Sequence, residues 1–244
     1  MRFLSGFGLG LTALALVACG GDLTLPGSSA SADKAGFNPF SQESETSFGQ
    51  REVMKDPPVA EVMKAGELPE MSWGRADAPV TIIKYASLTC PFCKRFQVET
   101  YPQLKRDYID TGKVRFIIRE FPIGKASGTA TVALRCAKPE KYLALYEKYL
   151  AQQTAWVAQE VKTDAIFCVS SQGGMTRAAL DSCLPNRGMI AALNWVKERG
   201  RTLGVIGTPN FFVNGRLVKS VVGMKEIREM VDPILAGKGP ATNG

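Results

Sequence analysis

An apolar segment that runs almost directly into two cysteines constrains this chain more than any other feature of its sequence. The run Val80–Ser87 is too short and too apolar for a surface helix, and it predicts a buried strand. Cys90-Pro91-Phe92-Cys93 follows after two further residues. Pro91 suits the first turn of a helix, because its missing N–H has no partner inside the helix there. The two cysteines are therefore expected at a strand-to-helix junction.

Two cysteines at such a junction are suited to thiol–disulfide exchange. Free N–H groups and the positive end of the helix dipole face the first cysteine, and both favour a thiolate. Residues three apart share a helix face, so Cys93 can reach Cys90 to form a disulfide. In this interpretation Cys90 is the nucleophile or the attacked sulfur. Cys93 is the buried thiol that resolves the mixed disulfide.

Other uses of two cysteines fit less well. Haem attachment needs a histidine after the second cysteine, but residue 94 is Lys, and the chain contains no histidine. A four-cysteine zinc site needs a second close pair, whereas Cys136, Cys168 and Cys183 are far apart in sequence. We therefore expect neither a metal nor a cofactor. A purely structural Cys90–Cys93 disulfide remains an alternative.

The remaining patterns predict a β-α-β unit, a helical insertion and a β-β-α unit. A helix from Pro91 to about Asp110, kinked by Pro102, links the strand at 80–87 to a strand at 114–121. Asn214-Gly215 predicts a hairpin turn, and residues 225–235 predict an amphipathic helix. The predicted parts are a signal peptide at 1–18, a disordered tether at 19–50, a short helical segment at 51–66, a thioredoxin-like domain at 67–126 and 205–238, and an inserted helical domain at 127–204.

The first residues predict export and attachment to a membrane. A positive start, a short apolar run and small residues are typical of a secretory signal. Leu16-Val17-Ala18-Cys19 resembles the lipobox of bacterial lipoproteins, which implies that Cys19 is acylated and anchors the chain in a membrane. An ordinary signal peptide or a buried apolar helix is the alternative. The net charge of +7 is scattered without a basic run, so no nucleic-acid partner is expected.

Three segments carry a resemblance to a known family: APVTIIKYASLTCPFC, YIDTGKVRFIIREFP and GTPNFFVNG. They resemble the DsbA-like thiol:disulfide oxidoreductases of bacteria, in particular the membrane-tethered alphaproteobacterial type. The resemblance covers residues 67–236 and implies an α/β thioredoxin fold with an inserted all-helical domain. It also implies a periplasmic enzyme that oxidises unfolded or partly folded secreted proteins and is reoxidised by a membrane partner. The alternatives are a reductase or isomerase with the same fold, or a thiol-based binding module without redox turnover.

The resemblance assigns roles to four further residues. Thr208-Pro209 corresponds to the cis-proline loop of the family, whose backbone pairs with an extended substrate segment. A plain trans turn before a strand is the alternative. Cys136 and Cys183 correspond to a second, structural disulfide of the relatives, which leaves Cys168 either buried and inert or an alternative partner for one of them.

Two positions near the cysteines depart from the family pattern. Phe92 stands where the family usually has a histidine, and this change alone should raise the pKa of Cys90 and make the disulfide less oxidising. Lys84 stands where the family usually has a buried glutamate. A charged Lys84 would favour the thiolate, and a buried neutral Lys84 could relay protons to Cys93. Alternatively, its amine reaches the surface and has little effect.

Overall fold

The computed structural model describes residues 53–238. The predicted signal peptide at 1–18, the tether at 19–50 and Cys19 lie outside the described residues. Within the predicted helical segment at 51–66, the structure contains helix α1, Val59–Met63. Within residues 53–238, no helix is both long enough and apolar enough to cross a membrane.

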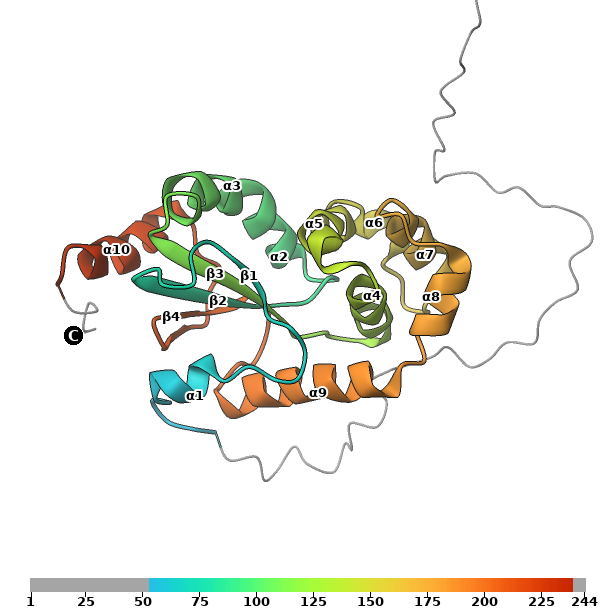
Figure 1. Ribbon diagram of the computed structural model, residues 1–244, viewed down its shortest axis with the longest axis horizontal. Coiled ribbons are helices and arrows are strands. Elements are labelled where there is room, and N and C mark those ends of the chain that lie inside the picture. Colours follow the sequence, from blue (N-terminus) through green and yellow to red (C-terminus); the bar gives the residue numbers. More distant parts are fainter. Residues whose placement is uncertain (1–52, 239–244) are drawn as a thin grey trace, which may run out of the picture. The chain divides into compact units, whose positions relative to one another are not determined.

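A mixed sheet with strand order β1-β3-β2-β4-β5 lies at the centre of the described residues (Figure 1). β2 and β3 are parallel, and the other neighbouring pairs are antiparallel. Every residue of β2 except Thr81 is buried, which explains its apolar sequence, because this central strand has both faces covered. The strands are β1 Met71–Trp73, β2 Val80–Ala86, β3 Val114–Glu120, β4 Asn210–Val213 and β5 Arg216–Val218.

The predicted helix between β2 and β3 is present, and it alternates between α-helical and π-helical turns. It is made of α2 Pro91–Arg95, η2 Phe96–Thr100, α3 Tyr101–Leu104 and η3 Lys105–Ile109. The N–H of Tyr101 bonds to the carbonyl of Phe96, five residues back. The helix thus widens immediately before Pro102, which has no N–H to continue an α-helical ladder.

The hairpin turn at Asn214-Gly215 is confirmed, and it also holds the start of β2. Both residues have positive φ, 43° and 86°, as a tight hairpin turn requires. The Asn214 side chain accepts from the Thr81 N–H at 2.7 Å and donates to the carbonyl of Pro79 at 3.2 Å. The turn therefore fixes β4 and β5 beside the strand that leads to the cysteines.

Helices cover both faces of the sheet (Figure 1). α2 to η3 and α10, Met224–Leu235, lie on one face, where Phe96 is stacked on Phe116 with ring centroids 6.2 Å apart. α1 and α9, Arg187–Thr202, lie on the other face. A Cβ at Gly200 of α9 would come within 2.7 Å of the Tyr85 ring, so only glycine permits this close approach.

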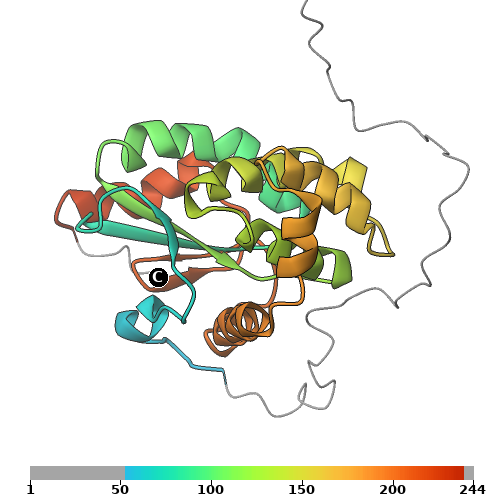
Figure 2. The same cartoon turned by 45° about the vertical axis from the view of Figure 1, so that its right-hand side comes forward.

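A cluster of short helices lies beyond one end of the sheet (Figures 1 and 2). Its members are α4 Lys125–Arg135, η4 Pro139–Lys141, α5 Tyr142–Ala151, α6 Gln153–Trp156, α7 Thr163–Ser171 and α8 Arg177–Cys183. The predicted bounds of the inserted helical domain, 127 and 204, differ from the bounds of this helical cluster. α4 begins at Lys125, and α9 returns to the sheet, where Val196 packs in one core with Tyr85. Helical periodicity defines a buried face but not the element that covers it.

Cys136 and Cys183 form a disulfide with Cα atoms 6.0 Å apart. It joins the end of α4 to the end of α8 and so closes the helical cluster. Cys168 lies in α7 and is half-buried. The pairing implied by the family resemblance is therefore present in the structure.

Removing this disulfide should destabilise the protein without removing its chemistry. The double variant Cys136→Ser/Cys183→Ser should lower the free energy of unfolding by about 4 kcal/mol, because the crosslink closes a loop of about 48 residues in the unfolded chain. Urea unfolding of oxidised wild type and variant would measure the difference. A variant as stable as the wild type would contradict this expectation.

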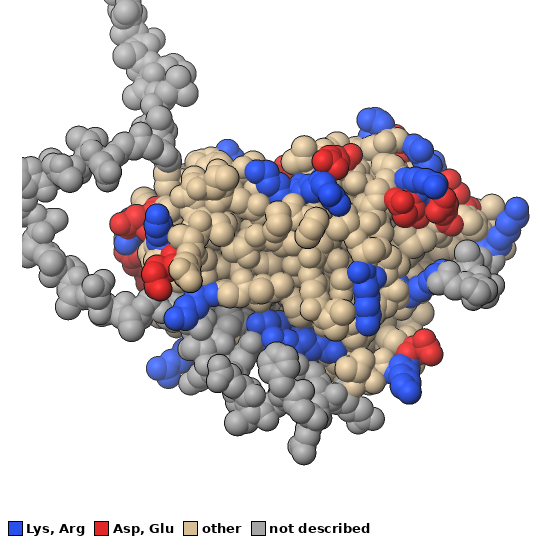
Figure 3. Space-filling view, turned by 180° about the vertical axis from the view of Figure 1, so that it is seen from behind, with Lys and Arg blue, Asp and Glu red and all other residues tan. Residues whose placement is uncertain are grey.

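Charged side chains are dispersed over the face seen in Figure 3. Lys and Arg side chains on that face are separated by acidic and uncharged residues rather than forming a continuous basic band.

Candidate active site around Cys90 and Cys93

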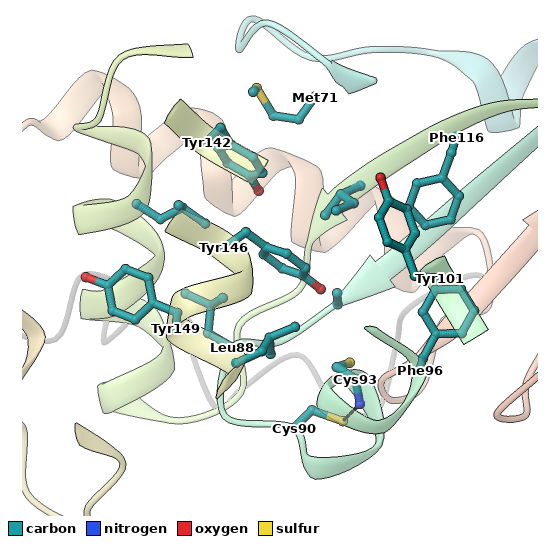
Figure 4. Close-up of a cluster of buried hydrophobic side chains, with 14 of the residues drawn as sticks. Met71, Leu88, Cys90, Cys93, Phe96, Tyr101, Phe116, Tyr142, Tyr146 and Tyr149 are labelled. Carbon is teal, nitrogen blue, oxygen red and sulfur yellow. Dashed lines mark hydrogen bonds between the residues drawn. The ribbon is translucent and has the colours of Figure 1, made fainter. Parts of the chain in front are cut away.

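The backbone around Cys90 places its sulfur at the start of α2. Cys90 is the N-cap residue, with extended backbone angles of φ −78° and ψ 118°, and Pro91 occupies the first helical turn. The N–H of Cys90 donates to the carbonyl of Ser87 at 3.2 Å, and this bond turns the chain out of β2. The side chain then accepts from the N–H of Cys93 at 3.3 Å (Figure 4). The predicted strand-to-helix junction is confirmed.

Cys90 is the more acidic thiol of the pair. Its pKa is lowered to about 6, first by hydrogen bonding with the Cys93 thiol and then by Thr208 and the backbone N–H groups of Cys93 and Phe92, against the opposing effect of burial. The thiol donates to the carbonyl of Thr208 at 3.1 Å. The Thr208 hydroxyl is buried without a hydrogen-bond partner among the described residues, so it is available to donate to the sulfur once Cys90 ionises.

Cys93 has the opposite character. Its side chain is fully buried, and burial raises its pKa well above the ordinary value, with a further increase from hydrogen bonding to Cys90. In Figure 4 it lies on the inner side of Cys90, between that residue and the ring of Tyr146. The two thiols therefore differ as an exchange reaction requires, because one is ionised near neutral pH and the other holds its proton.

Lys84 lies in the middle of β2 and does not reach the surface. Its side chain is 0% exposed, and its amine has no hydrogen-bond partner among the described residues. The Nζ atom is 4.4 Å from the centroid of the Phe96 ring and 5.5 Å from that of Tyr146. Burial lowers the pKa of Lys84 to about 8, while the charges of Cys93 and Cys90 oppose the change. The alternative of a surface-reaching amine is therefore wrong.

The loop before β4 completes the site. The peptide bond between Thr208 and Pro209 is cis, as the family resemblance implies, rather than a plain trans turn. The loop brings Thr208 against Cys90, although the two residues are 118 positions apart in sequence. The structure thus gathers Cys90, Cys93 and Thr208 beyond the end of β2, and Lys84 of β2 lies near enough for its charge to interact with both cysteines.

Comparison with known proteins identifies the family. A family model described as thioredoxin matches residues 67–233. The chain belongs to the thioredoxin family. Its fold is shared with alpha-DsbA1 of Wolbachia pipientis, with TM-score 0.65 and 22% identity over 73% of this chain and 96% of that one. BdbD of Bacillus subtilis has TM-score 0.64 and 22% identity over 77% of this chain and 100% of that one. The predicted thioredoxin fold with inserted helices is confirmed.

Curated relatives of this thioredoxin-family chain are named for disulfide chemistry. A Rickettsia bellii protein named "Putative protein-disulfide oxidoreductase" is 30% identical over 151 residues, which are 60% of this chain and 57% of that protein. "Disulfide bond formation protein D" of Bacillus subtilis is 25% identical over 173 residues, or 68% of this chain and 77% of that protein. The chain therefore spans little more than half of the Rickettsia protein.

Phe92 lies on the exposed side of the site. Half of its surface is accessible, and its ring lies 5.3 Å from the guanidinium carbon of Arg95. Phe92 adds no side-chain donor or charge near Cys90. The pKa of Cys90 is nevertheless lowered to about 6, first by the hydrogen bond with Cys93 and further by the nearby Thr208 and the backbone N–H groups.

Sequence reasoning missed one residue of the site in this thioredoxin-family chain. Gln153, at the start of α6, donates from Nε2 to the carbonyl of Leu88 at 2.8 Å and to that of Cys90 at 3.1 Å. A single glutamine in a helical region carries no motif, and only the packing of the helical cluster brings it to the cysteine loop. No signal in one sequence could have identified it.

The reduced protein should show a thiolate titration with a midpoint near pH 6, because the pKa of Cys90 is lowered to about 6 from 9.0. The thiolate contribution to stability is fully present above pH 9 and is lost as the pH falls through about 6. Thiolate ultraviolet absorbance and alkylation rates would measure the midpoint, with Cys90→Ser as the control. A midpoint near the ordinary cysteine value of about 8.5 would contradict the description of the site.

Proposed function

We propose that this chain is a dithiol–disulfide oxidoreductase that exchanges disulfides with secreted proteins through Cys90 and Cys93, acting as an oxidant. One observation carries the proposal. Cys90 has a pKa of about 6 at the start of a helix, beside a buried Cys93 whose pKa is raised. A stabilised thiolate favours the reduced pair, and a pair whose reduced form is stabilised is a better oxidant of other thiols.

The reaction needs no electrons beyond those of the sulfur atoms. A client thiolate attacks Cys90 in the oxidised pair, so that a mixed disulfide forms and Cys93 leaves as a thiolate. A second client thiolate attacks the client sulfur of that bond and releases Cys90. Two electrons pass from two client thiols to the Cys90–Cys93 pair, and the client gains a disulfide. A membrane redox partner then removes the two electrons and restores the pair, so no bound cofactor is required.

Lys84 supplies the proton that the leaving Cys93 needs. Cys93 is buried and has a raised pKa, so its thiolate is strongly basic. The pKa of Lys84 is about 8, and transfer of a proton from its ammonium group to this thiolate is favourable. Of the two cysteine charges, that of Cys93 has the larger effect on Lys84. The amine therefore serves as the proton donor in a chain that contains no histidine.

Client binding uses the backbone beside the cis peptide. An extended client segment pairs with the backbone at Thr208, next to the Cys90 sulfur, and such pairing is largely independent of client sequence. Unfolded and partly folded chains offer segments of this kind. The clients are therefore secreted proteins before they have folded.

The lipid anchor at Cys19 holds the enzyme on a membrane surface facing the periplasm, and the lipobox sequence before Cys19 supports this location. The intact mass of the membrane-extracted protein should begin at Cys19 and include acyl chains. A soluble chain that begins at another residue would refute the anchor. That result would not affect the proposed exchange reaction.

Two assays establish the direction of catalysis. The oxidised enzyme should convert a reduced two-cysteine peptide to its disulfide faster than the reduced enzyme reduces insulin. The side chain of Phe92, which gives Cys90 no charge or hydrogen-bond donor, favours the alternative function of reductase or isomerase. Faster insulin reduction, or repair of scrambled disulfides without net oxidation, would select that alternative. Failure of both assays would refute the exchange function altogether.

A further inference from the structure

The side chain of Gln153 connects the helical cluster to the loop that carries Cys90. Gln153 is 9% exposed, and its amide nitrogen donates to two carbonyls of that loop, Leu88 at 2.8 Å and Cys90 at 3.1 Å. A glutamine NH₂ group has two hydrogens, so both carbonyls are served by one side chain. Leu88 is itself 3% exposed, and its carbonyl would lose its partner in the interior without this contact.

Gln153 is held in position by the core of the helical cluster. Three residues further on, Trp156 is fully buried and donates from Nε1 to the carbonyl of Tyr149 at 2.8 Å. The two rings pack edge to face with centroids 5.3 Å apart. The carbonyl of Gln153 accepts from the N–H of Val157 at 2.8 Å, which completes the single turn. The amide is therefore presented to the loop from a fixed support.

The contact with Cys90 acts on the residue that carries the reactive sulfur. The Cys90 carbonyl accepts from Gln153 and also from the N–H of Lys94, at 3.2 Å, in the first turn of the helix. Two donors on this carbonyl fix the orientation of the N-cap residue. That orientation sets the Cys90 sulfur 3.3 Å from the Cys93 nitrogen and 3.1 Å from the Thr208 oxygen.

We infer that Gln153 is a positioning residue for disulfide exchange, which holds Cys90 in the orientation that stabilises its thiolate. The inference rests on the proposed function. It also makes the helical cluster part of the redox site, because the cluster supplies a hydrogen-bond donor to the backbone of the reactive cysteine. Without Gln153 the loop moves relative to the N–H of Cys93, so the thiolate loses stabilisation and the pair becomes a weaker oxidant.

Gln153→Met tests this inference, since methionine matches glutamine in length and has no donor. Gln152→Met is the matched control, because neighbouring Gln152 exchanges two 2.9 Å hydrogen bonds with Gln172 and none with the cysteine loop. Gln153→Met should raise the pKa of Cys90 by about one unit and shift the equilibrium with glutathione about tenfold toward the disulfide. Gln152→Met should change neither quantity.

A purely structural role for Gln153 would give a different result. Gln153→Met would then lower the urea midpoint while the Cys90 titration and the glutathione equilibrium matched those of Gln152→Met, and the inference would be overturned. Absence of exchange in the wild type would instead refute the proposed function. These two failures are distinguishable, because the first requires a fully active wild type.

A measurement on the unaltered protein covers the case in which Gln153→Met does not fold. The side-chain amide protons of Gln153 should exchange with solvent at least about tenfold more slowly than those of half-buried Gln152. The reason is that the two amide protons of Gln153 are hydrogen-bonded to buried carbonyls. Nuclear magnetic resonance of the labelled side chains would measure both rates. Equal rates would overturn the inference whatever the variants do.

Discussion

Replacing Cys90 with serine should abolish disulfide exchange, lowering the rate about a thousandfold or more, because a hydroxyl is not ionised near neutral pH and cannot form a disulfide. Replacing Cys93 with serine should have a different result. The Cys90 thiolate remains, so a mixed disulfide with a client can form but cannot be resolved from within. Incubation with an oxidised client peptide, followed by non-reducing electrophoresis and mass spectrometry, would detect the adduct.

The control for this experiment is the Cys136→Ser/Cys183→Ser variant. Its disulfide lies within the helical cluster, at the ends of α4 and α8, and it should retain exchange activity at temperatures where it is folded. An adduct mapped to a cysteine other than Cys90 would contradict the assignment. So would full turnover by Cys93→Ser.

Replacing Lys84 with methionine should stabilise the protein and weaken it as an oxidant. The pKa of Lys84 is lowered from 10.5 to about 8, so burial of its charge costs about 3 kcal/mol. That cost is fully present below pH 8 and disappears as the pH rises to 10.5, and the gain from Lys84→Met should follow the same dependence. The gain should be larger in the oxidised protein, because the reduced protein loses the attraction between the ammonium group and a thiolate.

Urea unfolding of both redox forms at pH 7 and pH 10.5 would measure these differences. Lys113→Met is the matched control, because Lys113 also faces an aromatic ring, with Nζ 5.6 Å from the Tyr108 centroid, but is exposed. It should change stability by less than about 0.5 kcal/mol. A destabilised Lys84→Met protein, or an equal gain in both redox forms, would contradict this account of Lys84.

The sequence predicted those features of the site that depend on local chemistry. Pro91 after an apolar strand indicated the helix start, and Asn214-Gly215 indicated the hairpin, because few residues adopt those backbone conformations. The roles expected of Cys90 and Cys93 followed from their spacing. The cis peptide at Thr208-Pro209 and the disulfide between Cys136 and Cys183 were implied by the family resemblance. No local pattern determines a disulfide between residues that are 47 positions apart.

Features that depend on tertiary packing were beyond the sequence. The state of Lys84 was left open between the interior and the surface, and it is settled by β3 and β4 on either side of β2 and by the rings that cover its amine. The return of α9 to the sheet depends on Gly200 meeting Tyr85, which periodicity cannot reveal. Gln153 acts through two backbone carbonyls, and such contacts place little demand on the sequence around them.

The central claim is that the fold stabilises the Cys90 thiolate enough to make this pair an oxidant. Equilibration of the protein in glutathione buffers of graded potential, with alkylation and mass spectrometry of Cys90 and Cys93, tests it most directly. We predict one two-electron transition with a midpoint less negative than about −200 mV, toward the value of about −120 mV for DsbA. A midpoint near the value of about −270 mV for thioredoxin, or no transition of this pair, would contradict the claim.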